Sequence, residues 1–155
     1  HKEYRRQRQM CIRDSRSEWT DDDGLRPLSK KGRMQSEALI DAVGDIVIGR
    51  IISSPSLRCL QTIEPLAEQF GLAVEVSDAF AEGADGEEAY RILRELDADD
   101  GVACSHGDVI PLLLRRLVAD GMETDGPLID RKGSMWIIET RDGRPFRGRY
   151  TNPPD

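Results

Sequence analysis

Three residues have side chains whose types and positions suit phosphate chemistry. Arg58 lies in the first turn of an expected helix that follows the apolar pair Ile51-Ile52 and a serine-rich turn, and His106 directly follows the apolar stretch 101–105. Glu82 lies in an expected loop between them. A guanidinium beside free helix N–H groups suits a phosphate, which it can bond bidentately. An imidazole can share the charge of a phosphoryl group, and a carboxylic acid can protonate a leaving oxygen.

Each of these residues also has an ordinary structural explanation. Arg58 could be a surface arginine on an amphipathic helix, and Glu82 could be one of the many solvated acids of this chain. His106 could be a structural histidine that caps the following helix through Asp108. From the residue types alone, both explanations stay open for all three positions.

The elements that must position these residues alternate between strand and helix. Apolar runs and helical spacing predict strands at 50–53, 73–76, 101–105 and 134–140, and helices at 30–43, 56–70, 87–96 and 109–120. The Asp142-Gly143 pair predicts a hairpin turn, after which 146–150 returns antiparallel. The alternation predicts an α/β fold in three layers, with a mainly parallel sheet, helices on both faces and an antiparallel C-terminal edge strand. Arg58 and His106 would then face one edge of the sheet, where ligands bind in such folds.

Several details of these elements are also predicted. Ser29 is the expected N-cap of the first helix, whose inward side chains would be Met34, Ala38, Leu39 and Ala42. Pro65 predicts a kink or a break near residues 63–64 of the second helix. The expected inward residues of the third helix are Tyr90, Leu93 and Leu96.

Residues 1–16 differ from the rest of the chain. They contain six Lys/Arg against two Asp/Glu, and they lack any period that would place a helix or strand. Residues 8–15 resemble translated sequencing-adapter DNA. We therefore expect residues 1–16 to be a non-native or disordered arm, 17–150 to form one domain, and 151–155 to be a tail.

Composition excludes several classes of function and partner. The net charge of −7 argues against a broad nucleic-acid surface, and no apolar run approaches the length of a membrane helix. The N-terminus lacks the apolar region of a secretory signal. The cysteines Cys11, Cys59 and Cys104 have no metal-like spacing and no arginine six residues on, so a thiol nucleophile is not expected. These features favour a cytoplasmic protein with reduced, packed thiols.

Four separated motifs resemble the histidine phosphatase superfamily, the phosphoglycerate-mutase-like group. They are Arg26-Pro27-Leu28-Ser29-x-x-Gly32-x-x-Gln35, Ser53-Ser54-Pro55-x-x-Arg58-Cys59-x-Gln61-Thr62, Ala81-Glu82-Gly83 and Ser105-His106-Gly107-Asp108. The resemblance covers about residues 16–150. It is nearest to small bacterial phosphohistidine-phosphatase-like domains of the SixA type, including those that follow a Nudix domain in one chain.

The resemblance implies an activity and a role for each site residue. The family hydrolyses phosphate esters through a transient phosphohistidine, without metal or other cofactor. Arg58 matches a phosphate-clamping arginine, His106 the histidine that stabilises the transferring phosphoryl group, and Glu82 the proton donor. The implied substrate is a phosphorylated small molecule or a phosphohistidine protein.

The chain departs from the family at the nucleophile. The family places it in an Arg-His pair at the end of the first strand, and this sequence contains no such pair. Counting back from Ser17-Glu18-Trp19 puts the pair near Gln9-Met10, and methionine cannot accept a phosphoryl group. We therefore expect the first strand, the nucleophile and one arginine to be missing, with little turnover and an aggregation-prone chain. The alternatives are a non-catalytic anion-binding module and a regulatory domain once attached to a Nudix hydrolase.

Overall fold

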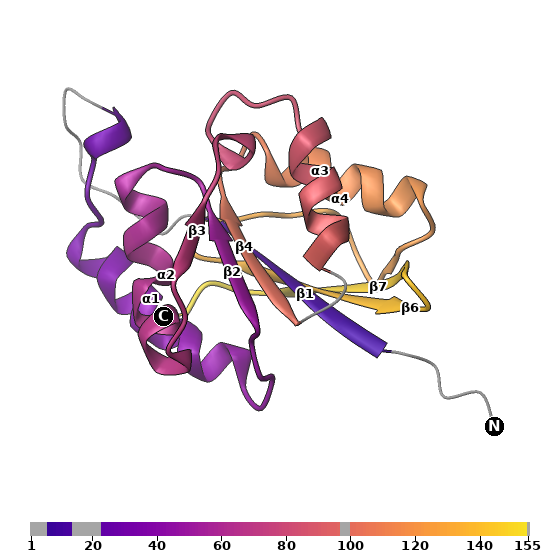
Figure 1. The fold of residues 1–155 in the computed structure, drawn as a ribbon, viewed down its shortest axis with the longest axis horizontal. Helices are drawn as coiled ribbons and strands as arrows, with labels where there is room; N and C mark the ends of the chain where they lie inside the picture. Colours follow the sequence, from indigo (N-terminus) through magenta and orange to yellow (C-terminus); the bar gives the residue numbers. More distant parts are fainter. Residues whose placement is uncertain (1–5, 14–22, 97–99, 155) are drawn as a thin grey trace.

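Seven strands form one sheet in the computed structural model, which describes residues 6–13, 23–96 and 100–154 (Figure 1). The strands are β1 (Arg6–Arg13), β2 (Arg50–Ser53), β3 (Val74–Val76), β4 (Gly101–Ser105), β5 (Glu123–Thr124), β6 (Met135–Arg141) and β7 (Arg144–Thr151). The helices are α1 (Lys30–Val43), α2 (Leu57–Phe70), α3 (Glu87–Glu95) and α4 (Ile110–Ala119), with short 3-10 turns η1 (Asp23–Leu25) and η2 (Asp78–Phe80). Within these residues, no helix is long and apolar enough to cross a membrane.

The sheet is mainly parallel, as the sequence predicts. Its strand order is β3-β2-β4-β1-β6-β7-β5. β3, β2, β4 and β1 run parallel, β6 is antiparallel to both β1 and β7, and β5 is parallel to β7. The C-terminal strand β7 pairs antiparallel with β6, as predicted, but it lies one strand in from the edge of the sheet. The reversed strand is β6, inside the sheet, and β5 covers the outer side of β7 because two residues of the expected loop 123–133 pair with it.

β1 lies in the middle of the sheet. It pairs with β4 from Gln9↔Gly101 to Arg13↔Ser105, and with β6 from Arg6↔Arg141 to Ile12↔Met135. The expectation that residues 1–16 lie outside the fold is therefore wrong for residues 6–13, while 1–5 and 14–16 fall outside the described residues. Backbone pairing with two neighbours forms this strand, although its polar first half carries no period-2 pattern. The non-native origin of the segment stays a prediction.

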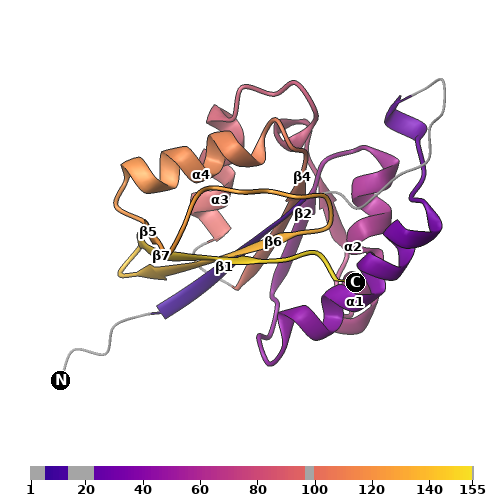
Figure 2. The same cartoon turned by 180° about the vertical axis from the view of Figure 1, so that it is seen from behind.

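Helices cover both faces of the sheet (Figures 1 and 2). α1 and α2 pack over Ile51, Val102 and Cys104, and the fully buried Ile12 of β1 joins this cluster. The residues that alternate with these, Ile52 and Ala103, face α3 and α4. The period of two along the strands thus divides the core into two clusters, one for each helical layer.

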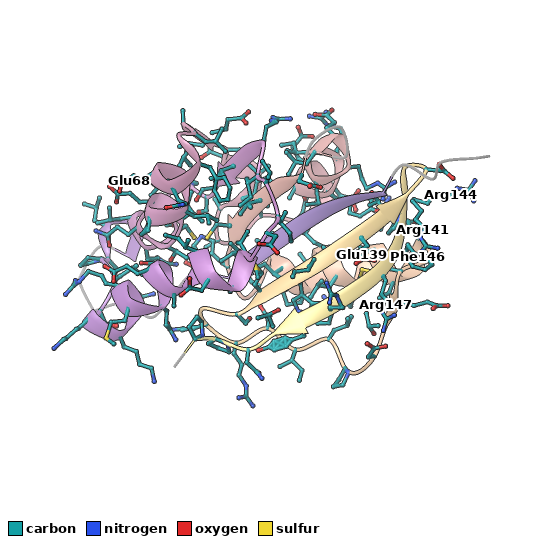
Figure 3. The ribbon with its side chains drawn as sticks, turned by 90° about the horizontal axis from the view of Figure 1, so that it is seen from below. Glu68, Glu139, Arg141, Arg144, Phe146 and Arg147 are labelled. Atoms are coloured by element: carbon teal, nitrogen blue, oxygen red, sulfur yellow. The ribbon has the colours of Figure 1, made fainter. Side chains whose placement is uncertain are left out.

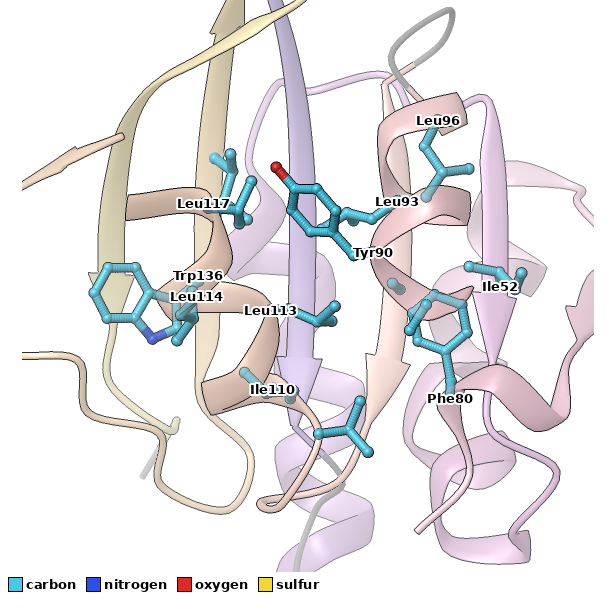
Figure 4. Packing of buried hydrophobic residues seen from close by; sticks show 14 of the residues in the cluster. Ile52, Phe80, Tyr90, Leu93, Leu96, Ile110, Leu113, Leu114, Leu117 and Trp136 are labelled. Atoms are coloured by element: carbon cyan, nitrogen blue, oxygen red, sulfur yellow. The ribbon is translucent and has the colours of Figure 1, made fainter. Parts of the chain in front are cut away.

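The second cluster forms between the sheet and helices α3 and α4 (Figure 4). Tyr90, Leu93 and Leu96 point inward, as predicted. They meet the apolar face of α4 and Trp136 of β6. This packing fixes the α3–α4 layer, and with it the loop that leads from η2 to α3.

Two details of helices α1 and α2 differ from the prediction. α2 runs through Pro65 as one helix of 14 residues, so the expected break is absent; the buried Ile63 and Leu66 on either side of Pro65 hold it against the sheet. In α1, Leu39 is buried as expected, but Met34 is 55% exposed and Gln35 is buried instead. The buried face of α1 is therefore rotated towards Gln35, a polar residue of the motif at residues 26–35.

The β6–β7 hairpin turns at Asp142-Gly143, as predicted. Both residues have positive φ, 50° and 75°, which matches the twist of a two-residue hairpin. At its tip the Arg141 guanidinium lies 3.8 Å from the centre of the Phe146 ring, and Figure 3 shows both side chains at the end of the molecule away from α2. Because Arg141 pairs with Arg6 at the start of β1, the turn lies at the opposite edge of the sheet from Ser105 and His106.

Candidate active site

Arg58 is buried despite its charge. It follows the β2 strand and the Ser54-Pro55 turn, as the second residue of α2, and is 2% exposed. The explanation as a surface arginine is therefore wrong. A buried cation needs partners, and Nη2 donates to Glu82 Oε2 at 3.0 Å and to His106 Nδ1 at 3.1 Å.

His106 follows the carboxyl end of β4 and is 2% exposed. An arginine can only donate, so Nδ1 must accept from Arg58 and the ring proton must lie on Nε2. Nε2 lies 2.7 Å from Ser54 Oγ, which therefore accepts from it. The Cys59 Sγ atom is 3.6 Å from Nε2 and completes the buried surroundings of the ring. The structure thus assigns the neutral imidazole one tautomer.

The helix-capping explanation for His106 is also wrong. The Asp108 carboxylate does not serve the histidine ring or the start of α4; it accepts from the Gly83 N–H at 2.7 Å. The α4 cap, Val109, makes no side-chain cap hydrogen bond. Asp108 therefore fastens a neighbouring loop.

The loop that carries Glu82 is hydrogen-bonded on both sides of this residue, to the end of β4 and to the residues that follow it. Ser105 Oγ donates to the Phe80 carbonyl at 2.6 Å, before Glu82, and Asp108 holds Gly83, after it. The Glu82 side chain is 55% exposed, so its carboxylate joins the buried Arg58 to solvent. The structure thus brings all three predicted site residues into one hydrogen-bonded group.

This arrangement suits an incoming oxyanion. Arg58 is a buried cation that pairs with the half-exposed Glu82, and a phosphate could take over that hydrogen bond. Within the described part of the chain, no group of three or more His, Cys, Asp or Glu side chains is placed to hold a metal ion. The polar side chains that the structure gathers at this point are those of Arg58, His106 and Glu82.

Sequence reasoning missed the roles of Ser54 and Ser105. The sequence predicts them only as parts of a motif or a strand and predicts no side-chain hydrogen-bond partner for either. The signal was their position, since each is a small hydroxyl residue at the end of a buried strand. The Cys59 and Cys104 side chains are buried, as predicted, and form no disulfide within the described residues, while the side chain of Cys11 lies outside them.

The end of β1 carries no histidine. The strand ends at Arg13, opposite Ser105, so it runs beyond the Gln9-Met10 position deduced by counting back from the following loop. Asp14 follows in the sequence, and the two histidines of the chain are His1 and His106. The first strand is therefore present, contrary to expectation, but an Arg-His pair is absent from the sequence.

A groove between α3 and α4 lies apart from this site. Its lining includes Tyr90, Arg91 and Arg116. Arg91 pairs with Glu88 and Glu95, and Arg116 pairs with Glu87. Its charges are mixed and largely paired within the groove, so it offers no particular preference for an anion.

The sequence is similar to a known protein family and to a known protein. Residues 12–89, half of the chain, match the family model of the histidine phosphatase superfamily (branch 1). An 8-oxo-(d)GTP phosphatase of Mycolicibacterium smegmatis is 33% identical over 145 residues. The match covers 90% of this chain but only 45% of that protein, so the chain spans about half the length of this relative.

Solved structures share the fold. The SixA phosphohistidine phosphatase from Nakamurella multipartitia superposes with a TM-score of 0.79 at 15% identity, covering 97% of this chain and 98% of that one. A protein histidine phosphatase SixA complexed with tungstate gives 0.70 at 20% identity, covering 94% of each chain. A mycobacterial glucosyl-3-phosphoglycerate phosphatase with inorganic phosphate gives 0.64 at 18% identity, with 88% and 95% covered. With its motifs, sheet and matched residues taken together, the chain belongs to the histidine phosphatase superfamily.

Proposed function

We propose that this domain is built as a metal-independent phosphatase, and that the chain as written binds a phosphoryl group without turning it over. The observation that carries the proposal is the buried Arg58, whose guanidinium is shared between Glu82 and the His106 ring. A desolvated guanidinium next to a loop carboxylate suits a group with three anionic oxygens. Apart from His106, the sequence contains only His1, so the described residues of the site include no second histidine to accept the phosphoryl group after binding.

The reaction of the intact domain would proceed in two steps. A histidine nitrogen attacks phosphorus while the bond to the leaving oxygen breaks, and that oxygen takes a proton from Glu82. Water then attacks phosphorus and gives a proton to the Glu82 carboxylate, while the bond between phosphorus and the histidine nitrogen breaks and releases phosphate. Arg58 and His106 stabilise the charge on the transferring group in both steps. In this chain the first step lacks its nucleophile, so binding remains and hydrolysis is lost.

The relatives suggest two substrate classes. The M. smegmatis relative is named for 8-oxo-(d)GTP, and the SixA structures for phosphohistidine. We therefore propose a phosphorylated small molecule, such as a nucleotide, or a phosphohistidine protein as the ligand of this site. We propose no nucleic-acid or membrane partner, and we propose a cytoplasmic location.

The experiment is a paired measurement of binding and turnover. The chain is titrated with phosphate and with tungstate by calorimetry, and its thermal unfolding is followed with and without each anion. Selective binding to the native state should raise the melting temperature. Hydrolysis of p-nitrophenyl phosphate should not exceed that of His106→Ala. Failure to bind either anion would overturn the proposed site, and turnover that His106→Ala abolishes would overturn the loss of catalysis.

A second candidate function is regulatory. The relative is about twice as long as the matched region, which leaves room for another domain, and we propose a Nudix hydrolase domain in the parent gene. Sequencing the source DNA upstream of the coding region tests this. An in-frame Nudix motif would support it, and an unrelated upstream region would exclude it. The same DNA sequence shows whether the codons for residues 1–16 are present in the source organism.

A further inference from the structure

Ser54 has a complete set of hydrogen bonds around the His106 ring. It is fully buried, and its Oγ lies 2.7 Å from His106 Nε2. The same oxygen accepts from the Ser56 N–H at 3.3 Å and lies 3.4 Å from Ser56 Oγ. A hydroxyl has one donor and two acceptor sites. Two accepted bonds, from Nε2–H and Ser56 N–H, and one donated bond, to Ser56 Oγ, use all three.

The opposite side of the ring faces Arg58. Arg58 Nη2 donates to Nδ1, so Nδ1 cannot carry a proton in this arrangement. The Arg58 guanidinium, which can only donate, thus holds the Nδ1 side of the imidazole, and the Ser54 hydroxyl accepts from the Nε2 side. Neither Ser56 Oγ, at 3.5 Å, nor Cys59 Sγ, at 3.6 Å, approaches Nε2 as closely.

We propose that Ser54 is a positioning residue that holds His106 as the Nε2–H tautomer, with Nδ1 turned towards Arg58 and the phosphoryl site. This inference rests on the proposed function for the meaning of that site, but not for the tautomer itself. Fixing the unreactive side of a histidine ring sets which nitrogen faces the ligand. Ser54 would act on the phosphoryl group only through His106, so it is not a catalytic residue.

Ser54 would thereby determine which nitrogen of the His106 ring faces a bound anion. When an oxyanion engages Arg58, it lies beside Nδ1, which must take up a proton before it can donate to the anion. Ser54 accepts from Nε2–H both before and after that proton is taken up. Without the Ser54 hydroxyl, the buried Nε2–H would lose its acceptor at 2.7 Å and keep only the longer contacts to Ser56 Oγ and Cys59 Sγ among those described above, which is costly. The ring would then turn, or its proton would move to Nδ1, where it would face the Arg58 N–H.

The test is a spectroscopic reading of the ring. The chain has only two histidines, so a sample labelled with ¹⁵N-histidine gives two imidazoles, and substitution of His1 assigns them. Long-range proton–nitrogen correlation at mildly alkaline pH, without phosphate, should show His106 with a protonated Nε2 and a bare Nδ1. Ser54→Ala should shift both nitrogens towards exchange between tautomers, and Ser54→Thr should restore the pattern.

Ser53→Ala is the matched control. Ser53 is equally buried and one residue earlier, but its hydroxyl donates to the Ser54 carbonyl. It should leave the His106 nitrogens unchanged. A protonated Nδ1 in the unmodified protein, or an unchanged Nε2–H pattern in folded Ser54→Ala, would overturn the proposal. If Ser54→Ala does not fold, the unmodified protein and Ser54→Thr still decide it, because both must show the Nε2–H pattern.

The two proposals fail separately. The tautomer is read without any anion, so a protein that binds no phosphate can still confirm or refute the role of Ser54. Adding phosphate to the same samples then tests the site. If the proposed function holds, phosphate should move the His106 Nδ1 resonance in the unmodified protein more than in Ser54→Ala.

Discussion

Arg58 is the residue on which the proposed anion binding would depend, because it supplies the buried positive charge of the site. Arg58→Met keeps much of the side-chain length but removes the charge and every donor. Hydrogen bonds to charged groups contribute about 1.5–3 kcal/mol each, so losing one should weaken tungstate binding by about tenfold or more. Calorimetry measures this.

A control for Arg58→Met is Arg91→Met. Arg91 is an exposed arginine on α3 that pairs with Glu88 and Glu95, apart from the site. It should bind tungstate as the unmodified chain does. Equal affinity of Arg58→Met and Arg91→Met would mean that Arg58 does not contact the anion.

The site residues were predictable because each lies at a local junction. Arg58 and His106 follow apolar strands in the sequence, and parallel strands bring such junctions together without further information. The hydroxyl partners were not predictable in the same way. Which donor Ser54 accepts from depends on the pairing of β2 with β4, a contact across about fifty residues that no local pattern encodes.

Tyr90 gives a pH dependence at the residue scale. Burial, helped by a hydrogen bond to Asp120, raises its pKa to about 12, while Arg94 and Arg116 oppose the shift. The unfolded value is about 10. A raised pKa means that the folded state favours the neutral phenol, so this stabilisation is fully present below pH of about 10 and is lost as pH rises towards 12.

A titration of phenolate absorbance measures this shift. The difference between the unmodified chain and Tyr90→Phe should titrate near 12, above an ordinary tyrosine. The urea midpoint of the unmodified chain should also fall more steeply than that of Tyr90→Phe between these two pH values. A Tyr90 signal near 10 would show that the phenol is not held by burial and Asp120.

At the scale of elements, the cap of α1 is a local device with a measurable effect. The Ser29 hydroxyl accepts from the Gly32 N–H at 3.1 Å, satisfying one of the free N–H groups at the start of the helix. Ser29→Ala should lower the free energy of unfolding by about 1 kcal/mol. Ser29→Asp, which keeps an acceptor, should lose much less. Chemical denaturation compares them, and equal loss in both variants would indicate that packing, not capping, is at stake.

Elements that depend on local patterns were predicted, and those that depend on distant pairing were not. The β4 strand and the Asp142-Gly143 hairpin follow from apolar runs and turn chemistry, and both are confirmed. β5 exists only because two residues pair with β7, and β1 only because β4 and β6 flank it. α2 continues through Pro65 because its buried face outweighs one lost hydrogen bond.

At the scale of the whole molecule, β1 joins the two halves of the sheet. On one side it extends the parallel strands β2 and β4, which lead into Arg58 and His106, and on the other it pairs with the β6–β7 hairpin. The expected aggregation of the chain assumed that this strand was missing and that its neighbours exposed their edges. That premise is wrong, because β1 fills the gap between β4 and β6.

Hydrogen exchange tests this central place for β1. Residues 9–12 pair with β4 and β6 together, whereas residues 6–8 pair with β6 alone. The amides of residues 9–12 should therefore exchange about as slowly as those of β4, and those of residues 6–8 faster. The edge strand β3 pairs only with β2 and gives the internal comparison. If β1 exchanged at the rate of an unstructured peptide while β4 stayed protected, residues 1–16 would be an arm outside the sheet. The two halves of the sheet would then need another contact to hold His106 beside Ser54.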